Sequence, residues 1–126
     1  MTPPKPTSAE LAILHVLWKR GASTVREVHD VLGGEQGIGY TTVLKQMQIM
    51  RKKGLVRCDT SRMTHSYEAA VSEAETQTHL VEDLLDDAFH GSAGMLVLRA
   101  LSARRSTPEE LAEIRKLIEE LERRGS

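Results

Sequence analysis

The chain has 126 residues and a formal net charge of −1, with 40% apolar, 28% charged and only 3% aromatic residues. These values are ordinary for a globular protein of one domain, or of one small domain with an appended element. Apolar runs such as Met95–Leu98 are far shorter than the roughly 18 residues of a membrane span, and Met1–Pro6 lacks the apolar stretch of a signal peptide. We therefore expect a cytoplasmic protein that does not insert into a membrane.

The charge is unevenly distributed along the chain. Residues 1–71 contain ten Lys and Arg against six Asp and Glu, a net charge of +4, whereas residues 72–126 contain seven against twelve, a net charge of −5. This asymmetry favours an N-terminal part that meets a polyanion and a C-terminal part that does not, although solvated helix surfaces give similar counts.

The first two predicted helices each begin with a capping box, in which a Thr hydroxyl caps the first turn and a Glu three residues later reaches back. Thr7–Glu10 is the first box, and the helix that it opens ends at Gly21. Thr24–Glu27 is the second box, and its short helix is expected to stop at Gly33–Gly34.

A third helix is predicted over about Tyr40–Lys53, closed by Gly54 at a position where a left-handed residue is favoured. The pattern then becomes extended, because segments 55–58 and 65–68 are short and β-tolerant and enclose a polar turn. Three helices followed directly by a hairpin are the element order of a winged helix-turn-helix domain, which we assign to residues 1–71.

The C-terminal part, residues 72–126, is predicted to be a helical dimerisation domain. A helix over about 73–89 is broken by Gly91, and a short apolar helix over 95–101 precedes a last helix capped by Thr107. Helical units smaller than about 70–80 residues usually need extra support, which favours a homodimer, although these helices could instead pack only on the N-terminal domain. The apolar residues expected in the dimer interface are Leu80, Leu84, Leu111, Ile114, Leu117, Ile118 and Leu121.

The expected fold is therefore mainly α-helical with a small β-hairpin wing. Within it, the third helix has one apolar and one polar side. Positions 43, 46, 47 and 50 share a side that is apolar except for Gln46 and is expected to face the core. The opposite side carries hydroxyl, amide and ammonium groups. Gln can pair with an adenine edge, Lys can meet guanine or phosphate, and Thr and Leu methyl groups can touch thymine, so this side suits the DNA major groove.

The predicted DNA contacts come from this polar side, its shoulders and one arginine in the hairpin turn. An exposed polar side is by itself typical of any solvated helix, but its place on the third helix before a hairpin favours DNA binding. Arg62, in the hairpin turn, could reach a phosphate or the minor groove. The complete predicted set is Tyr40, Thr41, Thr42, Leu44, Lys45, Gln48, Lys52 and Arg62.

Eight short motifs follow one another along the chain. They are Ser8–Leu11, Val16–Trp18, Val25–Val28, Gly39–Leu44, Met50–Val56, Tyr67, Phe89–Ser92 and Leu96–Leu98. In this order they strongly resemble the penicillinase-repressor family, the BlaI/MecI/CopY-type transcriptional regulators. The resemblance covers nearly the whole chain, and several motifs in the right order are far more specific than any one of them.

The resemblance implies a repressor that binds a palindromic operator as a homodimer, upstream of β-lactam-resistance or cell-envelope genes. It also implies relief of repression by cleavage in the C-terminal region, with a membrane metalloprotease sensor as a partner. The characterised staphylococcal members of the family carry Asn-Phe at the cleaved bond, after a Leu-Val-Leu segment. Here Arg99 and Ala100 follow that segment, so the corresponding cleavage region has a different chemistry.

Three other interpretations of the function can be compared with a proteolytically regulated DNA-binding repressor. An enzyme or a metalloprotein lacks support, because no histidine lies in a catalytic or zinc-binding motif, lone Cys58 cannot supply paired thiolates, and the row Glu75, His79 and Asp83 is typical of a solvated helix. We therefore expect no catalysis, no metal and no cofactor. A winged helix that binds protein instead of DNA is disfavoured by the positive N-terminal half. A repressor released by a small-molecule effector remains an alternative.

Overall fold

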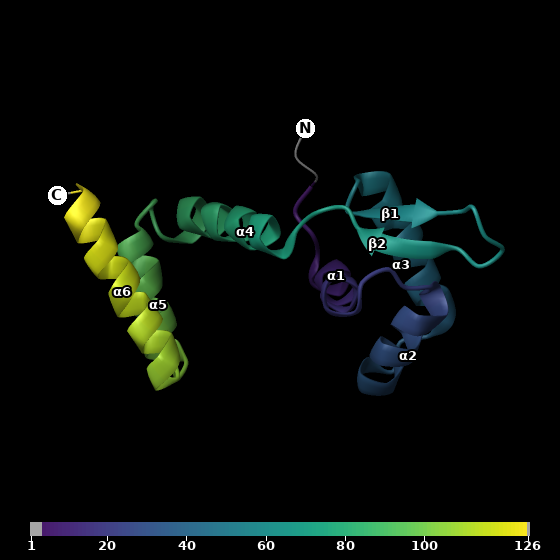
Figure 1. Ribbon diagram of the computed structural model, residues 1–126, viewed down its shortest axis with the longest axis horizontal. Coiled ribbons are helices and arrows are strands. Elements are labelled where there is room, and N and C mark those ends of the chain that lie inside the picture. The colour runs from purple at the N-terminus through teal and green to yellow at the C-terminus, as the bar shows by residue number, and fades with distance from the viewer. Residues whose placement is uncertain (1–3, 126) are drawn as a thin grey trace. The chain divides into compact units, whose positions relative to one another are not determined.

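The computed structural model describes residues 4–125, and of residues 34–36 it describes the backbone alone (Figure 1). Residues 1–3, which belong to the stretch tested above for a signal peptide, lie outside the described residues. The chain forms two compact units, Met1–Val81 and Glu82–Ser126, which are described separately.

The first unit contains three complete helices and a hairpin, in the predicted order, followed by the start of a fourth helix (Figure 1). Helix α1 packs against α2, α3 and β2, while α3 packs against α2 and β1. The hydrophobic core therefore lies where the three helices and the hairpin meet. The elements are α1 (Ser8–Arg20), α2 (Val25–Gln36), α3 (Tyr40–Lys53), β1 (Val56–Asp59) and β2 (Ser66–Ala69).

Both predicted capping boxes are present. The Thr7 hydroxyl accepts a hydrogen bond from the Glu10 amide at 3.2 Å, and the Glu10 carboxylate accepts one from the Thr7 amide at 2.9 Å. Thr24 and Glu27 make the same reciprocal pair at the start of α2. These bonds satisfy amide groups that a helix N-terminus otherwise leaves without partners, so each helix begins where the sequence predicts.

The end of α2 was predicted wrongly. The helix passes through Gly33 and continues to Gln36, and it ends at Gly37, whose backbone is left-handed with φ 65°. A glycine inside a helix costs only about 1 kcal/mol relative to alanine, so tertiary packing can carry a helix through it. At Gly33 a Cβ atom would lie 2.8 Å from Nε2 of His29, so the missing side chain makes room for that imidazole.

The hairpin pairs β1 and β2 antiparallel in the register Val56 to Ala69 and Cys58 to Tyr67. Both strands lie one residue later than predicted. Beyond the prediction, the loop between α1 and α2 joins this hairpin, because Ser23 and Tyr67 exchange two backbone hydrogen bonds of 2.8 Å each. The wing is thus attached to the helical part through the backbone as well as through the core.

Aliphatic side chains from all these elements, together with one tyrosine, form the core. The predicted apolar side of α3 supplies Val43, Met47 and Met50, each 1% exposed or less. The complete buried cluster is Ile13, Leu14, Val16, Leu17, Val25, Val28, Leu32, Val43, Met47, Met50, Leu55, Val56 and Tyr67.

Helix α4 (Glu73–Ala88) begins in the first unit and ends in the second. The predicted boundary lies ten residues earlier, at 71/72. The start of α4 belongs to the first unit because Thr76 is buried, Glu73 lies 4.0 Å from His15, and the Trp18 indole N–H donates to the Val71 carbonyl at 2.9 Å. These contacts hold the start of α4 in the first unit.

The second unit contains α5 (Ala93–Ala103) and α6 (Pro108–Gly125). Ser92 caps α5 at the Met95 amide, so this helix begins earlier than predicted. Thr107 and Glu110 form the predicted capping box of α6. Among the residues that the structure describes, neither α5 nor α6 has a buried side chain.

Candidate nucleic-acid interface

The polar side of α3 lies at the surface, as predicted. Seven of the eight residues predicted to contact DNA are exposed, and Leu44 is half-buried. Gln46, on the apolar side, is half-buried, so it belongs to the edge of the core. The seven exposed residues are Tyr40, Thr41, Thr42, Lys45, Gln48, Lys52 and Arg62.

Helix α3 is anchored at its C-terminal end. Gly54 adopts the predicted left-handed conformation, with φ 82°, and its amide donates to the carbonyls of Met50 and Arg51. One residue earlier, Nζ of Lys53 donates to Oε2 of Glu10 at 2.7 Å, which ties α3 to α1. The Lys53 charge is therefore neutralised within the fold, whereas Arg51 and Lys52 remain exposed.

The Glu10 carboxyl is buried, with 1% exposure. Burial alone raises the pKa of Glu10, but the hydrogen bond from Lys53, the bond from the Thr7 amide and the Lys53 charge together hold that pKa below its usual value. The carboxylate is thus ionised at neutral pH, and it serves as a helix cap and as the partner of Lys53.

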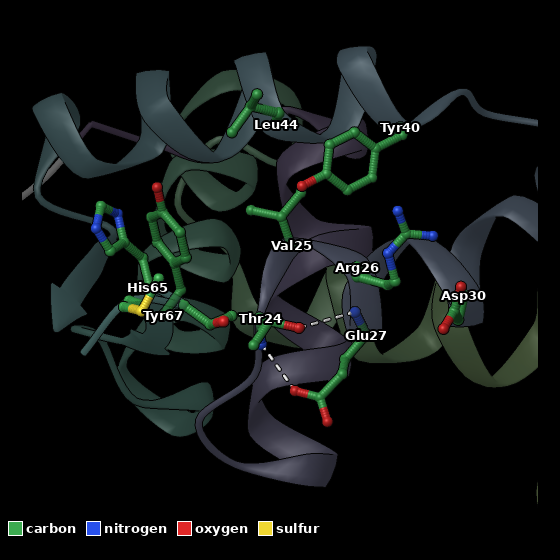
Figure 2. Close-up of a pocket in the computed structure, with 11 residues that line it drawn as sticks. Thr24, Val25, Arg26, Glu27, Asp30, Tyr40, Leu44, His65 and Tyr67 are labelled. Atoms are coloured by element: carbon green, nitrogen blue, oxygen red, sulfur yellow. Dashed lines mark hydrogen bonds between the residues drawn. The ribbon is translucent and has the colours of Figure 1, made fainter. Parts of the chain in front are cut away.

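Arg26 of α2, which sequence analysis did not single out, lies beside the first residue of α3. The Arg26 guanidinium stands 5.3 Å from the centroid of the Tyr40 ring (Figure 2). The His29 ring meets the same ring edge-on, with 6.0 Å between the ring centroids. Arg26 is exposed, and among the described side chains none forms an ion pair with it. The sequence does contain a signal that could have drawn attention to Arg26. The Thr24 capping box puts Arg26 in the first turn of α2, where the helix dipole disfavours a cation, so a positive charge there is unusual.

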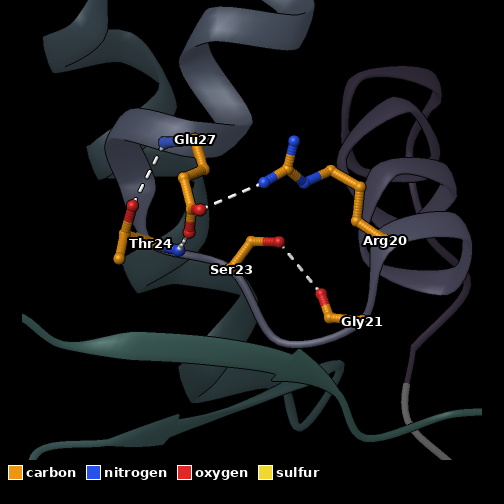
Figure 3. A network of polar contacts seen from close by, with 5 residues as sticks. All are labelled: Arg20, Gly21, Ser23, Thr24 and Glu27. Carbon is orange, nitrogen blue, oxygen red and sulfur yellow. Dashed lines mark hydrogen bonds and ion pairs between the residues drawn. The ribbon is translucent and has the colours of Figure 1, made fainter.

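The loop before α2 is held by a polar network. Glu27 accepts from the Thr24 amide and pairs with Arg20 at 3.0 Å, while the Ser23 hydroxyl donates to the Gly21 carbonyl at 2.9 Å (Figure 3). The bond from the Thr24 backbone is the main cause that lowers the pKa of the Glu27 carboxyl. Because Ser23 also pairs with the hairpin, this network positions α2 and the wing relative to each other.

The wing loop is ordered by Asp59 at the end of β1. Its carboxylate accepts from the Ser61 hydroxyl at 2.6 Å and from the Ser61 amide at 2.9 Å. The Ser61 hydroxyl is the main cause that lowers the pKa of Asp59, followed by the Ser61 amide. Arg62 and Met63 follow this turn at the tip of the loop, and both are exposed.

A groove of about 680 Å³ lies between the wing loop, the start of α2 and the first half of α3 (Figure 2). Tyr40 and Leu44 line it from α3, Arg26 lines it from α2, and Met63 and His65 line it from the wing. The wing tip and the first half of α3 therefore border the same groove.

Neither a metal site nor a membrane span is found in the part of the chain that the structure describes. Within residues 4–125, leaving aside the side chains of 34–36, no three His, Cys, Asp or Glu side chains lie close enough to hold a metal ion. Among the described helices, none is both long and apolar enough to cross a membrane.

Comparison with known proteins identifies the family. A family model described as the penicillinase repressor matches residues 6–120. The chain belongs to the penicillinase-repressor family. Proteins named transcriptional regulator BlaI from two strains of Mycobacterium tuberculosis, CDC 1551 / Oshkosh and ATCC 25618 / H37Rv, are each 30% identical to it over 114 residues, which cover 90% of this chain and 82% of theirs.

A solved structure supports the winged-helix fold. The solution structure of the DNA binding domain of the repressor BlaI matches with a TM-score of 0.53 at 22% identity, over 59% of this chain and 90% of that one. The architecture of this penicillinase-repressor family member is therefore a winged helix-turn-helix with further C-terminal helices, as the sequence predicts.

Proposed function

We propose that this protein is a transcriptional repressor that binds a palindromic DNA operator as a homodimer. The observation that carries the proposal is the polar side of α3. It is exposed while the opposite side of the same helix is fixed in the core, so Lys45 and Gln48 are held on a rigid element next to the wing. Family membership and the relatives named as regulators agree with this function.

The proposed contacts divide into two classes. Gln48 and Lys45 suit base edges in the major groove, and the methyl groups of Thr42 and Leu44 suit thymine. Lys52 suits the phosphate backbone, and Arg62 suits a phosphate or the minor groove; these cationic contacts position the protein without reading individual bases. Arg26 joins the second class, because its guanidinium is exposed beside Tyr40 at the start of the helix that enters the groove.

The homodimer is proposed to form through the C-terminal helices. Of the predicted interface residues, Leu84, Leu111, Leu117, Ile118 and Leu121 are between 40% and 53% exposed in a single chain, while Leu80 and Ile114 are half-buried. Helices α5 and α6, as described, bury no side chain, so this part lacks a core of its own. A second copy of the chain can cover this apolar surface, because a two-fold dimer brings the same stripe of both chains together.

Relief of repression is proposed to follow when cleavage in the C-terminal region weakens this dimer, in response to a membrane sensor protease. Arg99 and Ala100 are exposed but lie inside the regular helix α5. Cleavage between them therefore requires α5 to unwind first. A small-molecule effector that separates the C-terminal helices would act on the same equilibrium.

The deciding experiment selects duplexes from a randomised pool with the full chain and then titrates the selected duplex. We expect a palindrome whose half-site centres lie about one helical turn, or a multiple of it, apart. Affinity should fall with salt, with a log–log slope of about −0.9 for each neutralised phosphate. Equal affinity for every duplex, or binding that ignores salt, would contradict the proposal.

A further inference from the structure

Met63 is the most exposed large apolar side chain among those described in the first unit. Its relative exposure is 102%, whereas the next, Val81, is 42% exposed. Its neighbours in the loop, residues 60–65, are all exposed, so Met63 contributes nothing to the core. A single exposed apolar residue is common on protein surfaces, and exposure alone assigns no role. The role of Met63 depends on what holds it and what lies beside it.

The loop that presents Met63 is organised before any partner binds. Asp59 accepts both hydrogen bonds from Ser61, which fixes the turn immediately before Arg62 and Met63. A side chain on an ordered turn loses less conformational freedom on binding than one on an unstructured loop. The wing tip therefore offers a cation and a flexible apolar side chain next to each other on a preformed support.

The surroundings of the wing tip point to DNA. Met63 lines the groove that Tyr40 and Leu44 of α3 also line, so it borders the surface that the proposed function assigns to the duplex. When a helix occupies the major groove, one phosphate strand separates it from the neighbouring minor groove, which is about 6 Å wide. A narrow hairpin tip beside the helix is placed to reach across that strand.

The chemistry of the two tip residues suits a minor groove. The negative potential there attracts an arginine, and proteins that use this groove insert apolar side chains, methionine included, at base steps that unstack easily. Arg62 supplies the cation and Met63 the apolar wedge.

We propose that Met63 enters the minor groove next to Arg62 and selects operators with a flexible pyrimidine–purine step, TA or CA/TG, at that place. The inference rests on the proposed function, because it needs a duplex on α3. It adds a sequence preference at base pairs that α3 does not contact.

The test selects duplexes from a randomised pool with the full-length wild type, Met63→Ala, Met63→Leu and Thr60→Ala. The wild type, Met63→Leu and the control Thr60→Ala should each enrich a pyrimidine–purine step at a fixed distance from the half-site. Met63→Ala should keep the half-site sequence and lose the step preference. Its affinity for the selected duplex should fall about tenfold, the effect of one mismatched base pair.

A spectroscopic measurement distinguishes insertion of Met63 into the base step from a general loss of DNA affinity. A 2-aminopurine placed in the step should brighten when the wild type binds, since the base unstacks, and should stay dim with saturating Met63→Ala. If Met63→Ala keeps the preference for the step, or if the wild type shows no such preference, the proposed insertion of Met63 is wrong, although the protein still binds DNA. If the wild type selects no sequence at all, the proposed function fails instead.

Discussion

Single residues in this protein carry several tasks, and Glu10 is the clearest case. Its carboxylate caps α1, accepts a hydrogen bond from Lys53 of α3 and is 1% exposed. A buried charge is tolerated only when it is paired and hydrogen-bonded, and both conditions are met here. The Glu10 carboxylate thereby joins α1 to α3, the proposed DNA-reading helix.

Replacing Glu10 by Gln should destabilise the fold by about 1–3 kcal/mol at pH 7, because a hydrogen bond to a charged partner is lost. The folded pKa of Glu10 is lowered, so its stabilising effect is complete above the unfolded pKa, about 4.3, and disappears as pH falls through the folded value. The two proteins should therefore converge in stability at acidic pH. Urea unfolding followed by the fluorescence of Trp18 measures this.

The control is Glu68→Gln, which removes an exposed pair with Arg57 at 3.1 Å. Exposed pairs contribute little because water screens them, so this variant should unfold almost like the wild type. A Glu10→Gln protein as stable as Glu68→Gln at pH 7 would show that the buried pair has no net effect on stability.

The two classes of proposed DNA contacts should respond differently when their side chains are replaced by alanine. Lys45→Ala or Gln48→Ala should reduce discrimination at particular base pairs, by roughly 1–3 kcal/mol for a good bidentate contact. Arg26→Ala and Arg62→Ala should weaken binding to all sequences alike and make the salt slope shallower by about 0.9 each. Anisotropy titrations with the selected duplex and its single-base variants separate these results. Unchanged affinity in all four variants would remove α3 and its surroundings from the interface.

At the scale of elements, the proposed cleavage region in α5 can be compared with the connection between α5 and α6. Proteases bind their substrates as extended chains, so a bond inside a hydrogen-bonded helix is protected until the helix opens. Arg99 lies within α5, whereas Arg104 has extended backbone, φ −133° and ψ 146°, and Arg105 lies in the exposed connection.

Limited trypsin digestion should therefore cut the C-terminal unit after Arg104 or Arg105 before it cuts after Arg99. Mass spectrometry of early time points identifies the fragments. Cleavage after Arg99 at an equal or greater rate would mean that α5 opens readily in solution, and a sensor protease would then need no unwinding step.

At the scale of the whole molecule, association should depend on the apolar stripe of α6. Leu117→Glu places a charge in the proposed interface, where burying an unpaired charge is strongly unfavourable. The monomeric chain should still fold, because Leu117 is 53% exposed within it. We expect sedimentation to show a monomer at micromolar concentration.

Affinity for the selected palindrome should fall by about 10²–10⁴, because two joined domains bind the second half-site at high effective concentration. Affinity for a single half-site should not change. Ala112→Glu, an equal charge change on the other side of α6, is the matched control and should remain a dimer. A wild-type monomer would refute this assembly.

The elements with local causes follow from the sequence alone. Thr7, Thr24 and Thr107 begin their helices because the capping partners lie three residues away, and Gly54 ends α3 because its left-handed backbone is inexpensive only for glycine. The faces of α3 followed from helical periodicity, since the core accepts only one side of an amphipathic helix.

Features that join distant parts of the chain depend instead on tertiary packing. The Lys53–Glu10 pair spans 43 residues, and the Trp18–Val71 bond spans 53. The bridge between Ser23 and Tyr67, which attaches the wing, is of the same kind. Such contacts depend on how whole elements pack, and no periodicity or spacing within one segment encodes them. For this reason the bounds and the two faces of α3 could be predicted, whereas its anchors and the position of Arg26 against Tyr40 could not.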